Sequence, residues 1–118
     1  MKILCIGDIV GKPGRNAVKG LLKEIKGEQG VGLVIANAEN AAGGSGLSRK
    51  IAEELLSEGC DVLTLGDHAW DQKEMEEYLD EGRPVLRPGN FRPLILWKLI
   101  LVSLNFGISH SSDVLPGE

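Results

Sequence analysis

Short apolar runs alternate along the chain with segments whose apolar positions recur at helical spacing. The runs consist mainly of Val, Ile and Leu, which is typical of strands buried on both faces of a parallel sheet. We predict such strands at residues 3–7, 31–37 and 60–66, and a fourth, shorter strand at 84–86.

The segments between the runs carry apolar stripes that predict amphipathic helices with charged outer faces. The stripes are Val18, Leu21, Leu22 and Ile25; Ile51, Ala52, Leu55 and Leu56; and the shorter set Met75, Tyr78 and Leu79. Asp71, with Glu74 three residues later, resembles a capping box and is predicted to begin the third helix. The order β-α-β-α-β-α-β predicts an α/β fold: a mostly parallel sheet with flanking helices and right-handed crossovers.

The segment LILWKLILVSL, residues 94–104, departs from this alternation. It is too short to cross a bilayer, which takes about 20 apolar residues. The residues after it show no clear pattern. We therefore predict one domain over residues 1–91 and a divergent apolar tail over residues 92–118.

Charge and length narrow the classes of function. The chain of 118 residues has a net charge of −4, which argues against an extended nucleic-acid surface but allows a small nucleotide, whose contacts are local. The N-terminal apolar stretch is too short for a signal peptide, so we expect a cytoplasmic protein without a membrane segment. Cys5 and Cys60 lie in apolar runs without zinc spacing such as CxxC, and we expect both to be buried core residues.

Polar side chains follow each of the first three predicted strands. In a parallel α/β sheet, the carboxyl ends of the strands form the edge where ligands bind. The residues are Asp8 after the first strand, Asn37, Glu39 and Asn40 around the end of the second, and Asp67, His68 and Asp71 after the third. Acids that converge without a cation repel one another. A bound metal resolves this conflict, and the mixture of carboxylate, amide oxygen and imidazole suits Fe, Mn or Zn.

Each of these residues, taken singly, also has a plainer explanation. Asp8 can cap the next helix or turn, Glu39 can be a surface residue, and His68 can be structural. Asn40 and Asp67 can be turn formers, and Asp71 is best explained as an N-cap. The joint pattern is stronger than its parts, because three successive strand ends would have to carry such residues by accident.

The segment ENAAGGSGLS, residues 39–48, is either a slack linker or a loop that brings backbone close to a small ligand. A strand is predicted just before it, and Ser48 is a plausible cap for the helix after it, so we favour the loop. Two nucleotide motifs are absent after the first strand: neither GxxxxGK[ST] nor GxGxxG fits residues 7–15.

Four blocks, KILCIGDIVGKPGR, ANAENAAGGSGLS, LTLGDHAWD and VLRPGNF, resemble in order and spacing the bacterial 2′,3′-cyclic-nucleotide 2′-phosphodiesterases. These enzymes belong to the calcineurin-like metallophosphoesterase superfamily. The resemblance covers residues 2–91. It implies that residues 1–91 are the N-terminal part of a metallophosphoesterase domain, half of a four-layer αββα fold, and that residues 92–118 are not family-like.

The resemblance also implies roles for individual residues. Asp8 would bind the first of two metal ions, Glu39 would bridge both, Asn40 would lie beside the first, and Asp67 would bind the second. His68 would donate a proton to the leaving group. The metals would be Fe or Mn, with Zn as an alternative, and the substrate a small phosphodiester or nucleotide. The family usually has Asn where this chain has Asp67, and the extra charge would tighten metal binding or change metal preference.

Members of this family are longer than the chain, and their second half supplies further histidines in a Gly-His-x-His block. His110, the one histidine after His68, does not match that block. We therefore expect an incomplete dimetal site with weak or no activity alone, as in a truncated or frame-shifted gene product. Apolar surface left uncovered would favour a homo-oligomer or be covered by residues 94–104. The alternative hypothesis is a non-catalytic α/β module that binds a metal or nucleotide, or an interaction protein.

Overall fold

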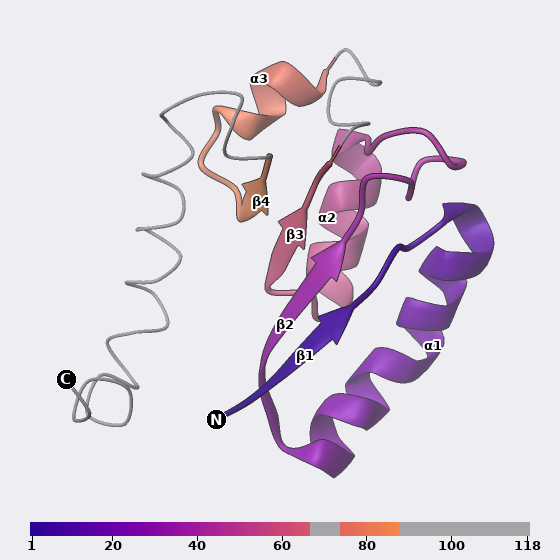
Figure 1. Ribbon diagram of the computed structural model, residues 1–118, viewed down its shortest axis with the longest axis vertical. Coiled ribbons are helices and arrows are strands. Elements are labelled where there is room, and N and C mark those ends of the chain that lie inside the picture. Colours follow the sequence, from indigo (N-terminus) through magenta and orange to yellow (C-terminus); the bar gives the residue numbers. More distant parts are fainter. Residues whose placement is uncertain (67–73, 88–118) are drawn as a thin grey trace, which may run out of the picture.

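A computed structural model of the chain describes residues 1–66 and 74–87. Four parallel strands lie in the order β1-β2-β3-β4: β1 (Lys2–Ile6), β2 (Val31–Asn37), β3 (Val62–Thr64) and β4 (Val85–Leu86). The helices between them are α1 (Gly11–Gln29), α2 (Arg49–Glu58) and α3 (Met75–Leu79) (Figure 1). The predicted α/β class and parallel sheet are therefore confirmed.

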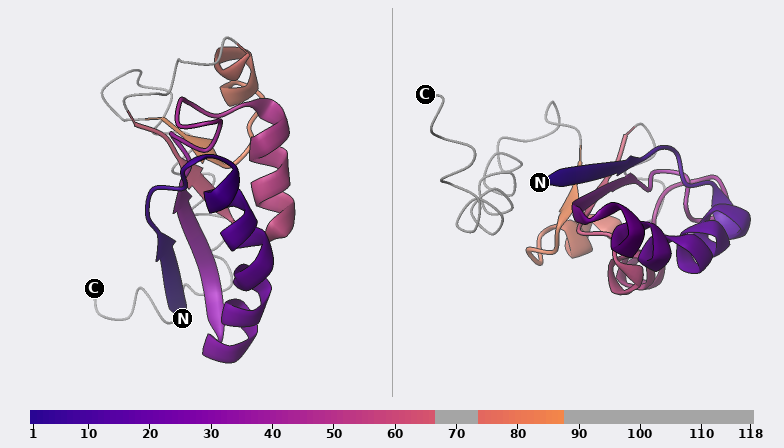
Figure 2. Two further views of the ribbon diagram at one scale, coloured as in Figure 1. Left: turned by 90° about the vertical axis from the view of Figure 1, so that its right-hand side faces the viewer. Right: turned by 90° about the horizontal axis from the view of Figure 1, so that it is seen from below.

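The two longer helices cover the same face of the sheet (Figure 2). This follows from the strand order, because each strand lies beside its predecessor and successive right-handed crossovers then fall on one side. The core on this face combines residues of the predicted apolar stripes with residues of the strands. The stripes contribute Val18, Leu22, Ala52, Leu55 and Tyr78, among others, and the strands contribute Val34, Ala36 and Leu63. Leu21 is the exception, with 54% of its surface exposed.

The helix ends follow local sequence signals. α1 ends at Gly30, which has φ 63° and donates its N–H to the carbonyl of Lys26. α2 begins after Ser48, whose Oγ accepts the N–H of Ile51 at 3.2 Å, so the predicted cap is confirmed. α3 begins at Met75 with no side-chain cap from the preceding residue. Asp71 lies outside the described residues, and its capping role stays a prediction.

Two expectations about the strands are wrong. β1 is not buried on both faces: it lies at the edge of the described sheet, Ile3 is 52% exposed, and Cys5 is exposed. Cys60 is buried as expected, but it belongs to the turn after α2, where its N–H donates to the carbonyl of Leu55 at 3.1 Å. The third strand accordingly begins at Val62.

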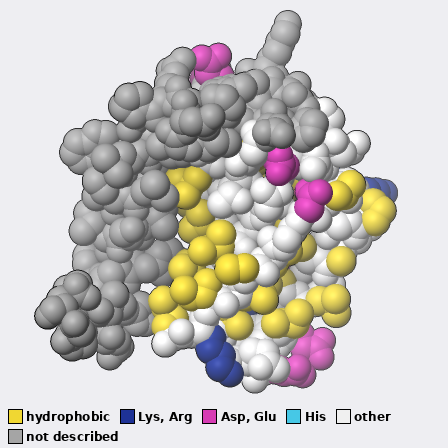
Figure 3. Space-filling model, in the orientation of Figure 1, with side chains coloured by type: hydrophobic (Ala, Val, Ile, Leu, Met, Phe, Trp, Pro, Cys, Tyr) yellow, Lys and Arg dark blue, Asp and Glu magenta, His cyan; other side chains and the backbone are white. Residues whose placement is uncertain are grey.

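The second face of the sheet carries apolar side chains outside the helix-covered core. Register places Ile3 beside Leu33, and Cys5, Ile35 and Val62 in one row across three strands. These residues do not belong to the core cluster beneath α1 and α2. Apolar side chains gather on this face in Figure 3. No described helix is long and apolar enough to span a membrane.

Candidate functional site

Asp8 and Asn40 join the carboxyl ends of β1 and β2. Nδ2 of Asn40 donates to both carboxylate oxygens of Asp8, at 3.0 and 3.1 Å. The carbonyl of Asn40 accepts the N–H groups of Gly11 and Gly44 at 3.0 and 2.9 Å, which fixes its backbone against the start of α1. The N-cap of α1 is Val10, without a side-chain cap, so a helix-capping role does not explain Asp8.

The carboxylate of Glu39 lies directly over Gly66, at the end of β3. A Cβ atom at residue 66 would lie 2.8 Å from Cδ and Oε1 of Glu39, and still closer to Oε2. Nδ2 of Asn37 donates to Oε1 of Glu39 at 3.3 Å and to Oγ1 of Thr64 at 3.5 Å. Residues from the ends of β1, β2 and β3 therefore meet at one edge of the sheet.

Residues 39–48 form a compact loop between β2 and α2, which excludes the linker interpretation. Nη1 of Arg15, on α1, donates to the carbonyl of Ala41 at 2.6 Å and ties the loop to that helix. Three glycines of the loop have positive φ, a conformation that other residues rarely adopt: 65° at Gly43, 87° at Gly44 and 79° at Gly46. A Cβ at Gly11 would lie 3.8 Å from Cα of Gly43, so the two site loops pack backbone against backbone.

The donor atoms at this edge suit a hard or borderline metal ion. Asp8 and Glu39 offer carboxylate oxygens, and Asn40 offers an amide oxygen. Asn40 now points its nitrogen at Asp8, so its amide would turn over to present oxygen to a cation that Asp8 also binds. The space above Gly66 holds the Glu39 carboxylate without a competing side chain. These residues fit a metal site.

The described residues make up only part of the predicted ligand set. Within residues 1–66 and 74–87, no three His, Cys, Asp or Glu side chains gather closely enough to hold a metal ion. Asp67 and His68 lie in the segment 67–73, outside the described residues. Their predicted roles, and the metal roles of Asp8, Glu39 and Asn40, stay predictions.

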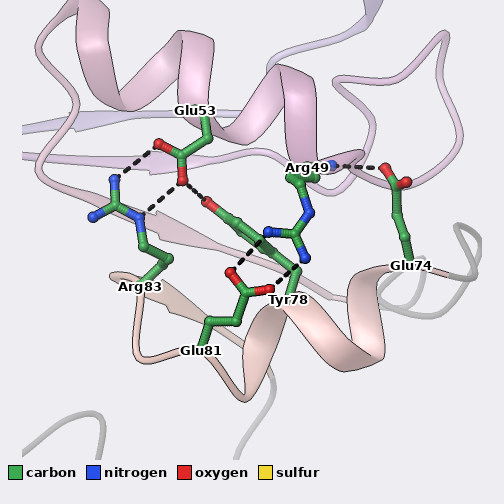
Figure 4. A network of polar contacts seen from close by, with 6 residues as sticks. All are labelled: Arg49, Glu53, Glu74, Tyr78, Glu81 and Arg83. Carbon is green, nitrogen blue, oxygen red and sulfur yellow. Dashed lines mark hydrogen bonds and ion pairs between the residues drawn. The ribbon is translucent and has the colours of Figure 1, made fainter.

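A polar network that the sequence did not reveal links α2 to α3 (Figure 4). The backbone N–H of Arg49 donates to Oε1 of Glu74 at 2.9 Å, and the guanidinium of Arg49 forms a two-point ion pair with Glu81. The same guanidinium lies 5.0 Å from the ring centroid of Tyr78. The partners lie far apart in the chain, so no local sequence signal could have identified them.

The other half of this network is built around Glu53. Oε1 of Glu53 accepts the hydroxyl of Tyr78 at 2.7 Å and Nε of Arg83 at 2.9 Å, and Oε2 accepts Nη2 of Arg83 at 3.0 Å (Figure 4). These bonds, first from Arg83 and then from Tyr78, lower the pKa of Glu53. The network therefore fastens α2, which directly follows the loop of residues 39–48, to Glu74, α3 and the turn after α3.

Comparison with known proteins gives a consistent family. Residues 4–97 match the sequence profile described as YmdB-like protein. The chain is 44% identical over 91 residues to the 2′,3′-cyclic-nucleotide 2′-phosphodiesterase of Bacillus subtilis, a match that covers 77% of this chain and 34% of that protein. The resemblance stated from the four sequence blocks is therefore confirmed.

Two solved structures are similar in fold and sequence. A hypothetical protein from Thermus thermophilus has a TM-score of 0.72 and 45% identity, covering 79% of this chain and 36% of its own. A phosphatase from Mycoplasma pneumoniae has a TM-score of 0.72 and 38% identity, covering 75% and 32%. The chain thus spans about a third of the length of these relatives.

Proposed function

The chain belongs to the family of YmdB-like proteins, and from this membership we propose that it carries the N-terminal, metal-binding part of a phosphodiesterase. Its substrates would be cyclic nucleotides or related small phosphodiesters. The Bacillus relative is named for 2′,3′-cyclic nucleotides, and the Mycoplasma relative is named a phosphatase. Hydrolysis of a phosphate ester is the chemistry that both names share.

The convergence of three strand ends on one oxygen-rich edge supports this function most directly. Asp8 is held by Asn40, and the Glu39 carboxylate is seated over Gly66. Two carboxylates and an amide at one edge of the sheet make a natural place for metal ions, whose charge would offset the repulsion between acids.

The roles of the residues follow the family pattern. Asp8 would hold the first metal, Glu39 would bridge two, Asn40 would lie beside the first, and Asp67 would hold the second. When bound, Fe or Mn ions, or Zn, would polarise the phosphoryl oxygens and lower the pKa of a bound water. His68 would give its proton to the departing alkoxide.

A second function, a non-catalytic metal-binding or nucleotide-binding module, is favoured by one observation. The chain spans about a third of its relatives, so ligands that those proteins carry in their remaining length have no counterpart in the matched region. A site with part of its ligands can still bind a cation weakly while lacking the geometry for turnover.

Metal titration and a hydrolysis assay on the 118-residue chain separate these functions. We expect the chain to bind Mn²⁺, and Glu39→Ala to abolish this binding. With Mn²⁺ or Fe²⁺ present, we expect slow product release from a 2′,3′-cyclic nucleotide and from bis-p-nitrophenyl phosphate. His68→Ala should stop this release, and His110→Ala is the matched control that should leave it unchanged.

The outcomes are distinct. Metal binding that depends on Glu39, without turnover, would support the non-catalytic module. Turnover that survives His68→Ala would contradict the assigned proton donor. A folded chain that binds no Mn²⁺ or Fe²⁺ would contradict both functions.

A further inference from the structure

Asn37 and Gly66 contact the Glu39 carboxylate from two directions. Asn37 reaches it from the last position of β2 through Nδ2, and Gly66 lies beneath it after β3. We propose that these two are positioning residues, which hold Glu39 in one place and thereby set how tightly this edge binds a divalent cation. The inference rests on the proposed function, in which Glu39 is a metal ligand.

The position of Asn37 is fixed by the backbone on both sides. Its carbonyl accepts the N–H of Ile9 at 3.1 Å, and register pairs it with Thr64 on β3. The next residue, Ala38, donates its N–H to the carbonyl of Thr64 at 2.9 Å. An amide anchored in this way can orient a neighbouring carboxylate, because its own backbone has little freedom to move.

Gly66 contributes by the absence of a side chain. Its φ is not in the left-handed region, so the backbone conformation does not require glycine here. What requires it is space: a Cβ would meet Cδ and Oε1 of Glu39 at 2.8 Å, and Oε2 at a shorter distance. Any other residue at this position would push the carboxylate away from its place at the sheet edge.

The hydrogen bonding of Asn37 argues against a purely structural role. Its Oδ1 is buried and has no hydrogen-bond partner among the described residues. Burying such an atom lowers stability, so an apolar residue would suit the fold at least as well. What Asn37 provides in return is Nδ2, which donates to Glu39. Residues that serve a functional site commonly lower the stability of the fold, as the buried Oδ1 does here.

Binding of Mn²⁺ to the full 118-residue chain, followed by the electron paramagnetic resonance of free Mn²⁺, tests the proposal. We expect Asn37→Val and Gly66→Ala each to weaken Mn²⁺ binding by about 10–100-fold, the usual loss when a residue that orients a metal ligand is removed. The melting temperature of Asn37→Val should stay equal to, or above, that of the unmodified chain. A merely structural asparagine would give the opposite pattern.

Two control variants make the same substitutions, Gly to Ala and Asn to Val, at positions away from the site. Gly20→Ala lies on α1 with open space around its Cβ position, and Asn16→Val lies on the exposed side of the same helix. Both should bind Mn²⁺ like the unmodified chain. Thr64→Val removes the other acceptor of Asn37 Nδ2 while keeping Glu39, and it should weaken binding less than Asn37→Val.

The result separates this inference from the function on which it rests. If the unmodified chain binds Mn²⁺ and the Asn37 and Gly66 variants bind it equally well, the positioning roles are wrong and the metal site stands. If Asn37→Val does not fold, normal Mn²⁺ binding by Gly66→Ala would alone overturn the proposal. If the unmodified chain binds no Mn²⁺, the proposed function fails and the inference fails with it.

Discussion

The hydroxyl of Tyr78, the single tyrosine of the chain, lies inside the protein and donates to Glu53. Burial, and then the bond to Glu53, raise the pKa of Tyr78 from 10.0 to about 12. The folded state holds the hydroxyl proton more tightly than the unfolded state does. The contribution of protonated Tyr78 to the free energy of unfolding is therefore complete below pH 10 and is lost as the pH rises toward 12. We expect tyrosinate absorbance to appear only near pH 12 in the folded chain. Ionisation near pH 10 without unfolding would contradict this environment.

The variant Tyr78→Phe separates the hydroxyl from the ring. It keeps the packing and the contact with Arg49 but removes the bond to Glu53, so we expect it to lower the free energy of unfolding by about 1 kcal/mol. Because Phe has no hydroxyl to ionise, the variant should also lose less stability than the unmodified chain as the pH rises above 10. Chemical denaturation at about pH 7 and about pH 11, on either side of the ordinary tyrosine pKa, measures both effects.

The two cysteines offer a second contrast at the residue scale. Cys5 is exposed on the edge strand, whereas Cys60 is buried, and burial raises the pKa of its thiol to about 11. Since the thiolate is the reactive form, we expect iodoacetamide at about pH 8 to modify Cys5 in the folded chain and Cys60 only after denaturation. Mass spectrometry locates the label, and Cys5→Ser is the control that should stay unlabelled. Equal labelling of both would contradict the burial of Cys60.

The sequence indicates which residues lie at the ends of strands but not which residues of neighbouring strands contact them. Asp8, Glu39 and Asn40 could be placed at one edge because parallel strands end together. The close contact between the Glu39 carboxylate and Gly66 could not be predicted from the sequence, because it depends on the distance between two strands. The exposure of Cys5 was missed for the same kind of reason: an apolar run shows that a strand exists, not whether it lies at the centre or the edge of a sheet.

At the scale of elements, the segment between α3 and β4 is attached to α2 by ion pairs that are partly open to solvent. Glu53 and Arg83 keep 47% and 43% of their side-chain surface exposed, so screening limits what their two-point contact contributes. A double-mutant cycle with Glu53→Ala and Arg83→Ala should give a coupling of about 0.5 kcal/mol in the free energy of unfolding. The pair Glu54→Ala and Arg83→Ala is the control: Glu54 lies beside Glu53 on α2 but has no contact with Arg83 in the structure, so this pair should show no coupling.

The same ion pair predicts that the free energy of unfolding depends on pH in the acid range. The pKa of Glu53 lies below its ordinary 4.5, so its contribution is present above pH 4.5 and is lost as the pH falls below that value. In Arg83→Ala, the free energy of unfolding should therefore fall less steeply as the pH is lowered across this range than it does in the unmodified chain. A coupling that is absent would show that the contact seen in Figure 4 does not stabilise the fold, and a coupling unchanged at high salt and low pH would show that the contact does not act as an ion pair.

Helical periodicity and caps proved more informative about elements than strand composition. Apart from the exposed Leu21, the stripes of α1 and α2 and the cap at Ser48 are as predicted, because a helix is determined largely by residues close together in sequence. The strand predicted at 60–66 is shorter, Val62–Thr64, because Cys60 bonds back to α2. Such a bond uses a backbone group, and composition carries no record of it.

At the scale of the whole molecule, the described helices α1 and α2 cover one face of the sheet (Figure 2). Apolar residues such as Ile3 and Ile35 lie on the other face, outside the core cluster. Parallel sheets are normally covered on both faces. An apolar groove of about 190 Å³ also opens between β1 and α1, lined by residues that include Leu4, Ile6 and Leu21. The groove lies along β1, one of the two edge strands of the described sheet. β1 has 5 residues and β4 only 2, which makes β1 the edge where another chain would pair most easily.

Self-association of the chain should therefore depend on β1. We expect sedimentation to show oligomers that increase with protein concentration, and Ile3→Lys to shift them toward monomer, because a charged residue on an edge strand opposes pairing. Val10→Lys is the matched control: Val10 is 49% exposed, against 52% for Ile3, but it lies beyond β1, at the N-cap of α1. If both variants reduce association equally, general charge repulsion is the cause. A chain that stays monomeric at every concentration would show that the edge of β1 and the apolar side chains beside it are insufficient to bring two copies together.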